Sequence, residues 1–248
     1  MGRTIVRLAN QAADVKLVCA ISASDVGADA GELAGVGTIG VLLAGELSAL
    51  AESRAHVVID FSAAALVPKL ADVAARSNIA IVSGTTGLAD EARAALDRAA
   101  SRVAVLWEPN MSVGVHVLVT LVQRAMAALG PEYDVEIVET HHRQKADAPS
   151  GTALRLVEAA RGGQEAGAVV HGRQGRPGPR ARGEIGVHAV RGGDVIGDHV
   201  VHLFGEGERL ELIHRATSRD VFAHGALRAA HWIKGRPAGR YTLADCVA

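Results

Sequence analysis

The sequence has few of the residues that mark several large classes of protein. Aromatic residues make up only 3% of the 248 positions, so a core has to be built from aliphatic side chains, and 49% of the chain is apolar. The two cysteines, Cys19 and Cys246, form no CxxC pair, which argues against a disulfide framework and favours a reducing compartment. Neither charge predominates, with 26 basic and 27 acidic residues, whereas nucleic-acid-binding proteins usually carry a basic excess. Because the chain also lacks a membrane-length apolar run and a recognisable signal peptide, we expect a soluble cytoplasmic protein that binds neither nucleic acid nor membranes.

Short apolar segments alternate with helical patterns in the first half of the chain. This alternation predicts a parallel sheet with helices on both faces, which is a Rossmann-like, doubly wound α/β fold. The expected helices cover about residues 1–13, a segment ending at 76, 89–100 and 112–129, and the expected buried strands cover 15–22, 56–62, 79–83 and 103–107. Residues 29–35 are predicted to form a loop.

The pattern changes after residue 129, where strand-like segments follow one another without intervening helices. Such a succession predicts an antiparallel or mixed sheet in an α+β substrate domain. The expected strands are 133–139, 183–191, 198–204 and 209–217, the expected helices are 150–161 and 221–234, and 162–182 is predicted to be an exposed loop rich in Gly, Pro and Arg. We expect residues 1–112 and 222–248 to form a dinucleotide-binding domain, and residues 113–221 to form a substrate-binding and oligomerisation domain.

Ligands of open parallel sheets bind beyond the carboxyl ends of the strands. Here those ends carry glycines and small hydroxyl residues, at 60–62, 84–87 and 108–111. Such residues suit a ligand with phosphate or ribose groups, but they are equally compatible with ordinary turns between a strand and a helix.

The segment ETHHRQKADAPSGT, residues 139–152, has the residue types of an anion site with an acid beside it. A strand ends at Glu139, and His141 and His142 follow it. Lys145 comes three residues after the second histidine, and Ser150 or Thr152 can cap the next helix. The first backbone N–H groups of a helix point outward and attract anions. A histidine and a lysine beside such a helix start can bind a carboxylate or phosphate and donate a proton.

Two other interpretations of this segment stay open from the local chemistry. Paired histidines can belong to a zinc site, although no cysteine or suitably spaced histidine completes a ligand set nearby. The segment can also be a purely structural loop.

The whole pattern E-x-H-H-x-x-K-x-D-A-P-S-G-T-A resembles the signature of the 4-hydroxy-tetrahydrodipicolinate reductases, also called dihydrodipicolinate reductases, of bacterial lysine and diaminopimelate synthesis. The resemblance extends over essentially the whole chain. Further matching segments occur in the family's order at 29–35, 58–62, 84–87, 109–114, 191–199 and 218–226.

The resemblance implies a role for each matching residue. His141 would be the proton donor, Lys145 a second acid that also holds the substrate, and His142 a contact to a substrate carboxylate. Gly151 and Thr152 would bind the other carboxylate. Cofactor contacts are implied for Gly84, Thr85, Thr86, Glu108, Pro109, Asn110 and Met111. The implied reaction transfers a hydride from NADPH or NADH to the cyclic dicarboxylate, with loss of the 4-hydroxyl as water. The family precedent is a homotetramer built through the sheet of the second domain, and no metal is implied.

The sequence departs from the family at its start. The family's opening strand and its G-x-x-G-x-x-G phosphate loop have no counterpart here, because residues 1–3 align with the end of that loop. A different start site, a shortened form of the protein or a degenerate relative would each explain this. For a chain of this length we expect two unpaired inner sheet edges, weak cofactor affinity and a poorly stable N-terminal half. A non-catalytic relative and a related NAD(P)-dependent dehydrogenase of another small acid are the alternative functions.

Three further expectations concern charged and polar residues outside the signature. Ser22 and Ser24 stand where a residue usually reads the ribose 2′ position, and Asp25 is displaced from it, so we expect dual or weakly biased use of NADH and NADPH. The four arginines in residues 171–182 either belong to a solvated loop or reach the substrate or cofactor. The histidines of the later strands, His188, His199, His202 and His214, are predicted to be structural or interface residues.

Overall fold

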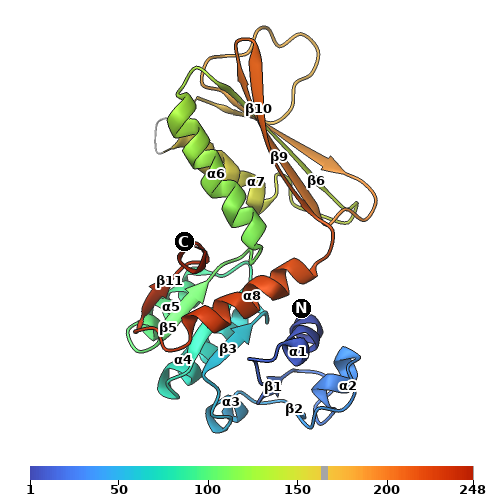
Figure 1. Cartoon of the computed structure of the whole chain (residues 1–248), viewed down its shortest axis with the longest axis vertical. Helices are drawn as coiled ribbons and strands as arrows, with labels where there is room; N and C mark the ends of the chain where they lie inside the picture. Colours follow the sequence, from blue (N-terminus) through green and yellow to red (C-terminus); the bar gives the residue numbers. More distant parts are fainter. Residues whose placement is uncertain (163–166, 248) are drawn as a thin grey trace. The chain divides into compact units, whose positions relative to one another are not determined.

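The computed structural model describes residues 1–162 and 167–247. The chain forms two compact units, which are described separately: unit 1 (Met1–Val113 with Asp220–Ala248) and unit 2 (Gly114–Arg219). Figure 1 shows the elements of both units. In the part of the chain that the structure describes, no helix is long and apolar enough to cross a bilayer.

Unit 1 contains a parallel sheet of four strands in the order β11-β5-β4-β3. Its elements are α1 (Gly2–Gln11), β1 (Ala20–Ile21), α2 (Ala30–Ala34), β2 (Leu43–Ala44), α3 (Ser48–Glu52), β3 (Val57–Asp60), η1 (Ala64–Leu66), α4 (Val67–Arg76), β4 (Ala80–Ser83), α5 (Asp90–Ala100), β5 (Ala104–Trp107), α8 (Asp220–Ile233), β11 (Gly239–Tyr241) and η2 (Ala244–Cys246). The predicted Rossmann-like class is confirmed for this unit.

Both faces of this sheet are covered, which explains why its strands read as continuous apolar runs. Around β4, Ile79 and Ile81 belong to one core cluster with α4 and α5, whereas Ala80 and Val82 belong to another with α8. Side chains alternate between the faces of a strand, so a strand covered on both sides has no polar face. This layering brings the carboxyl ends of β3, β4 and β5 to one edge of the sheet.

The predicted buried strand at residues 15–22 is wrong in extent and in burial. Within residues 15–22 only the two residues of β1 form a strand, because the partner strand β2 is two residues long and pairs with Ala20 and Ile21 alone. Val18 is 42% exposed. These two strands form a separate sheet, and no strand among residues 1–162 and 167–247 joins it to β3. The expected pair of unpaired edges, one on β1 and one on β3, is therefore present in the described residues.

The predicted loop at residues 29–35 is instead the short helix α2. The Asp29 carboxylate accepts hydrogen bonds from the backbone N–H groups of Gly31 and Glu32 at 2.8 and 3.2 Å, which caps the helix N-terminus. Gly35 ends the helix with a left-handed φ of 74°. The capping residues were present in the sequence, but the helix has only five residues and too little periodicity to be recognised.

Unit 2 contains a five-stranded mixed sheet in the order β10-β9-β6-β8-β7. Its elements are α6 (Val113–Leu129), β6 (Asp134–His141), α7 (Gly151–Arg161), β7 (Val169–Val170), β8 (Ile185–Arg191), β9 (Gly197–Gly205) and β10 (Glu208–Ala216). The strand β6 pairs in parallel with β8 and antiparallel with β9, which confirms the predicted mixed sheet.

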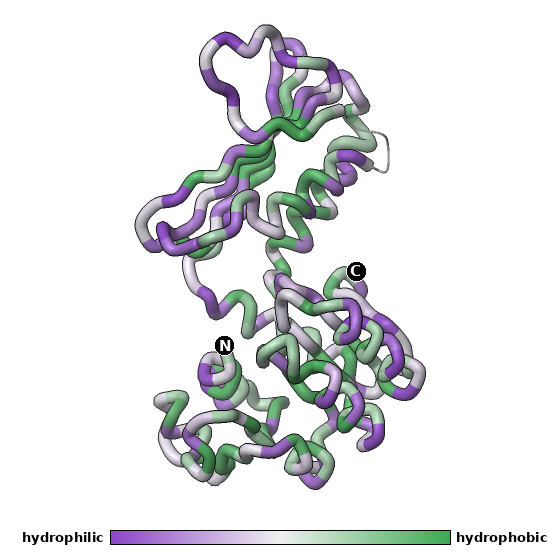
Figure 2. The backbone as a smooth tube through the Cα atoms, turned by 180° about the vertical axis from the view of Figure 1, so that it is seen from behind, coloured by the Kyte–Doolittle hydropathy of each residue, from purple (hydrophilic) through white to green (hydrophobic). Residues whose placement is uncertain are grey.

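Alternation along β6 explains how unit 2 is layered. Val135 and Ile137 point into a core cluster with Leu118 of α6 and Leu156 of α7, and both helices lie on the same face of the sheet (Figure 1). The residues between them are only partly buried. Figure 2 shows hydrophobic and hydrophilic segments following one another along the strands of this sheet. The buried face of β6 continues to the end of the strand, where it carries polar residues.

The predicted loop at 162–182 is anchored more firmly than a solvated loop. Residues 163–166 lie outside the described residues, and β7 follows and pairs with β8. Arg173 binds Glu136 and Glu184, Arg180 binds Asp134 and Glu136, and Arg182 pairs with Glu132. These three arginines are therefore bound to carboxylates of the same unit.

Candidate functional site

The carboxyl end of β6 places Glu139 and His141 on the buried face of the strand. They are two residues apart and so point the same way, beyond the apolar residues of that face. Glu139 is 0% exposed and His141 is 9% exposed. A buried carboxylate needs partners for its oxygens, and these partners define the site.

The Glu139 carboxylate accepts four hydrogen bonds. Its Oε2 accepts from His141 Nδ1 at 2.5 Å and from Arg191 Nη1 at 2.8 Å. Its Oε1 accepts from the Ser150 backbone N–H at 3.0 Å and from Arg191 Nη2 at 2.8 Å. Burial raises the pKa of Glu139, but the hydrogen bonds from Arg191 and His141 lower it by more, so the net direction is downward and the group is ionised near neutrality.

His141 stands among other groups that can carry positive charge. Burial lowers its pKa, and the positive charges of Lys145 and Arg191 lower it further, while Glu139 opposes the shift. His199 lies edge-on to His141, with 5.3 Å between ring centroids, and burial together with the neighbouring His141 lowers the pKa of His199 to about 4. We infer that both imidazoles are mostly neutral near pH 7, and that an anion bound beside His141 would favour its charged form.

The helix α7 begins beside this group. The Ser150 side chain caps it by accepting from the Ala153 N–H at 3.2 Å, and Ser150 Oγ also lies 3.3 Å from His199 Nε2. The sequence left Ser150 and Thr152 open as the cap, and the structure has Ser150 in that position. Gly151 and Thr152 form the first turn, where backbone N–H groups point out of the helix toward any bound anion.

Lys145 and His142 lie next to the same segment with partners of their own. Lys145 Nζ donates to both oxygens of Asp147, at 2.8 and 2.9 Å. His142 Nε2 lies 3.4 Å from Arg219 Nη2, and its buried Nδ1 has no hydrogen-bond partner within residues 1–162 and 167–247. All the substrate-site residues predicted from the sequence thus belong to unit 2, and Glu139, Arg191 and His199 join them.

Glu139, Arg191 and His199 lay within segments that matched the family, but no local pattern indicated their roles. Arg191 is 52 residues from Glu139 in the chain, and the two meet because β6 and β8 pair in parallel. His199 lies opposite Glu139 in the register of β6 and β9.

Unit 1 holds a second polar cluster where β3 and β4 end. The buried carboxylate of Asp60 accepts from Ser83 Oγ and Thr85 Oγ1, both at 2.7 Å, and from the Ser62 N–H at 3.0 Å. Trp107 Nε1 donates to the Thr85 carbonyl at 2.9 Å. Side chains from three parallel strands thus fix the main chain that follows β4.

The residues with implied cofactor roles fall at the ends of β4 and β5, but they differ in accessibility. Thr86 and Pro109 are exposed, Asn110 is partly buried, and Gly84, Thr85, Glu108 and Met111 are buried. A Cβ on Gly84 would lie 2.3 Å from the Phe61 ring, so glycine is needed there for packing. Met111 belongs to the core cluster under α8, which places its side chain among apolar residues.

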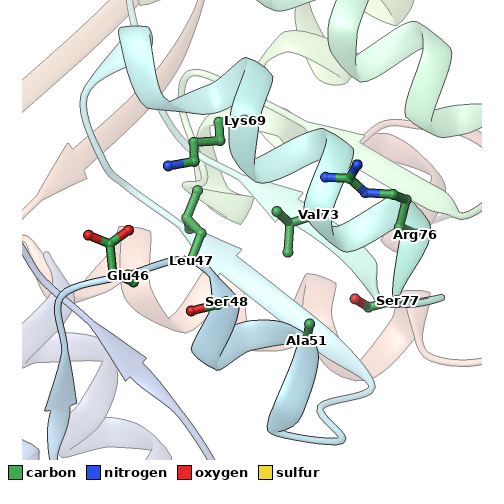
Figure 3. Close-up of a pocket in the computed structure, with 8 residues that line it drawn as sticks. All are labelled: Glu46, Leu47, Ser48, Ala51, Lys69, Val73, Arg76 and Ser77. Carbon is green, nitrogen blue, oxygen red and sulfur yellow. The ribbon is translucent and has the colours of Figure 1, made fainter.

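Other features of the described residues do not gather chemistry of this kind. A surface pocket of about 380 Å³ in unit 1 is lined by residues before and along α3 and α4 (Figure 3). It includes Lys69 and Arg76 but none of the described residues at the carboxyl ends of β3, β4 and β5. No group of three or more His, Cys, Asp or Glu side chains in the described ranges is arranged to hold a metal ion.

Comparisons with known proteins agree with the resemblance over the whole chain. The family model "Dihydrodipicolinate reductase, N-terminus" matches residues 1–111, and "Dihydrodipicolinate reductase, C-terminus" matches residues 114–247. A 4-hydroxy-tetrahydrodipicolinate reductase of Anaeromyxobacter sp. is 49% identical over 99% of this chain and 92% of its own length. A 4-hydroxy-tetrahydrodipicolinate reductase of Myxococcus xanthus is 45% identical over 99% of this chain and 93% of its own length.

A solved structure supports the fold. A dipicolinate-bound dihydrodipicolinate reductase from Paenisporosarcina sp. has a TM-score of 0.78 and 24% identity, over 97% of this chain and 92% of its own. The matches to both family models and the identity to full-length relatives confirm the resemblance recognised in the sequence. The chain therefore belongs to the dihydrodipicolinate reductase family, the NAD(P)H-dependent 4-hydroxy-tetrahydrodipicolinate reductases of lysine and diaminopimelate biosynthesis.

Proposed function

We propose that unit 2 binds the dicarboxylate 4-hydroxy-tetrahydrodipicolinate and that His141 is the proton donor of its reduction. The observation that carries this proposal is the cluster of His141, Lys145 and the N-terminus of α7 around the carboxyl end of β6. Two carboxylates call for cationic and N–H donors, and these elements supply both. The relative from Paenisporosarcina carries dipicolinate, a flat dicarboxylate, which supports a ligand of this class.

The protonation of His141 would follow substrate binding. In the free protein, burial keeps the pKa of His141 low, whereas the negative charge of a bound carboxylate raises it. Nδ1–H is engaged by Glu139, so the proton to be donated is on Nε2. The reduction consumes one proton as the 4-hydroxyl leaves as water, and His141 Nε2–H would supply it. Lys145, released in part from Asp147, would hold a substrate carboxylate and act as the second acid, and His142 and Thr152 would contact the carboxylates.

The ends of β4 and β5 in unit 1 fit a nicotinamide cofactor. Thr86, Gly87 and Pro109 are exposed there, and Gly87 has a left-handed φ of 68°. The main chain of residues 84–86 and 108–110 would hold the cofactor, and the Asp60 cluster fixes that main chain before the cofactor binds. NADPH or NADH supplies the hydride when bound.

The choice between NADPH and NADH stays a prediction of dual use. At the end of β1, Arg3 Nη2 lies 3.6 Å from Asp25 Oδ2, so each charge already has an opposite partner. Domain roles, a homotetrameric assembly and a cytoplasmic location also stay predictions.

The variant His141→Asn tests the assignment of the proton donor. We expect kcat/KM, measured from NADPH absorbance with freshly made substrate, to fall about 100- to 10,000-fold, because general acid catalysis contributes that much. The matched control is His188→Asn, since His188 also lies on a strand of unit 2 with a carboxylate partner, Glu136 at 2.7 Å.

Dipicolinate binding, measured by calorimetry, completes the experiment. The His141 variant should still bind dipicolinate, which shows that unit 2 remains folded. A His141→Asn protein with unchanged kcat/KM would overturn the assignment. Absence of NADPH oxidation in the wild-type chain would favour the non-catalytic alternative.

A further inference from the structure

A single buried carboxylate joins two parts of the candidate site that the sequence treats separately. One oxygen of Glu139 accepts from the imidazole of His141, and the other accepts from the backbone N–H of Ser150, which caps α7. The acid and the helix start that would bind the substrate are thus held by the same side chain. Because Glu139 is 0% exposed, solvent cannot substitute for either contact.

The guanidinium of Arg191 fixes the orientation of that carboxylate. Its two terminal nitrogens each donate to a different oxygen of Glu139, at 2.8 Å, which is the planar two-point geometry that arginine makes with carboxylates. The same guanidinium donates to the carbonyls of Val190 at 2.7 Å and Asp147 at 2.8 Å. Arg191 thereby ties β8 to the segment that leads into α7, and the carboxylate cannot rotate without breaking both bonds.

All acceptor positions of Glu139 are used by these contacts. An ionised carboxylate has about four lone-pair sites, and four donors occupy them here. His141 can therefore offer only its Nδ1–H to Glu139, which leaves Nε2 for the reacting side. Gly197 leaves space at that nitrogen, since a Cβ there would lie 3.0 Å from His141 Nε2.

We propose that Glu139, held by Arg191, is a positioning residue that sets the tautomer and orientation of His141 and couples them to the N-terminus of α7. The proposal rests on the assignment of His141 as the proton donor. It predicts that loss of the carboxylate charge leaves a smaller fraction of His141 protonated and also disturbs the fold around it.

The charged groups that face His141 determine the sign of the effect. Glu139 on β6 favours the imidazolium, whereas Lys145 of the following segment and Arg191 on β8 disfavour it, and His199 on β9 is neutral near pH 7. Removing the Glu139 charge leaves the two cations unopposed. The pKa of His141 should then fall, and kcat/KM, which depends on the protonated acid, should begin its decline at lower pH.

The test compares Glu139→Gln with Glu136→Gln across pH. Glu136 is the matched control, because it lies on the same strand, pairs with arginine and histidine, and points to the opposite face. In Glu139→Gln we expect the descending limb of kcat/KM to move down by about one pH unit or more, so that kcat/KM on that limb falls about tenfold or more. In Glu136→Gln the limb should stay where it is in the wild type.

Two further measurements keep the proposal testable if Glu139→Gln fails to fold. The double variant Glu139→Gln with Arg191→Gln removes both charges and should show a downward shift that is smaller, because the lowering effect of Arg191 on the His141 pKa is lost as well. In the wild type, nitrogen NMR of the labelled imidazole, assigned with His141→Asn, should show the neutral form protonated at Nδ1.

The outcomes separate this proposal from the proposed function. An essential His141 with an unmoved pH limb in Glu139→Gln, or a neutral wild-type imidazole protonated at Nε2, overturns the role of Glu139 alone. A dispensable His141 overturns the assignment of the acid and with it this inference.

Discussion

Replacing Glu136 with Gln should remove a defined part of the stability of unit 2. The Glu136 carboxylate accepts from Arg173 at 2.7 and 3.1 Å, from Arg180 Nε at 3.2 Å and from His188 Nε2 at 2.7 Å. Burial raises its pKa, but these partners, Arg173 first, lower it more, to about 2 from an ordinary value of 4.5. Gln has nearly the same shape but no charge to titrate.

The size of the effect follows from that pKa. Lowering a carboxyl pKa from 4.5 to about 2 corresponds to about 3 kcal/mol of folding free energy at pH 7. The side chain is 15% exposed, so partial solvent screening reduces the expected value to about 2 to 3 kcal/mol. Because the folded pKa is the lower one, this stability is complete above pH 4.5 and is lost as the pH falls toward 2.

Urea unfolding of both proteins at several pH values, followed by circular dichroism, measures this difference. We expect the wild type to be about 2 to 3 kcal/mol more stable than Glu136→Gln at pH 7, with about half of that difference lost near pH 3. The KM values should be unchanged, because Arg173 and Arg180 anchor the segment before β8 rather than bind substrate. A difference that does not depend on pH would refute the electrostatic argument, and a raised KM would show that these arginines act in binding.

Three further predictions concern the two polar clusters. Gly197→Ala should lower kcat about tenfold with little change in melting temperature, because a Cβ 3.0 Å from His141 Nε2 shifts the imidazole by a few tenths of an ångström; unchanged steady-state kinetics would show that the ring needs no such space. Ser150→Ala should cost about 1 kcal/mol of unfolding free energy by removing the cap of α7, measured by urea unfolding, and a neutral result would mean that the cap contributes no net stability. Asp60→Ala should cost about 2 to 4 kcal/mol and weaken NADPH binding in titration calorimetry, since the hydroxyls of Ser83 and Thr85 lose their shared acceptor; wild-type affinity in a less stable protein would limit the role of Asp60 to folding.

The helices and strands with long patterns could be predicted from the sequence. The strand β4 reads as an apolar run because both of its faces are covered, and β6 alternates because only one face is. The helix α2 and the strand β11 are short and therefore carry little periodic signal. The strand predicted at 15–22 failed because β-structure requires a partner, and β2 offers one to only two residues.

The family and the residues of the signature segment could be recognised from the amino-acid sequence alone. His141, Lys145 and the cap of α7 lie within a dozen positions of one another, so their common purpose can be read along the chain. The groups that surround them could be identified only once the chain was folded. Arg191 and His199 reach Glu139 and His141 through the pairing of β6 with β8 and β9, and register across a sheet depends on strands far apart in sequence. Burial, which sets the pKa values of Glu139 and His141, likewise arises only when the sheet and its helices pack.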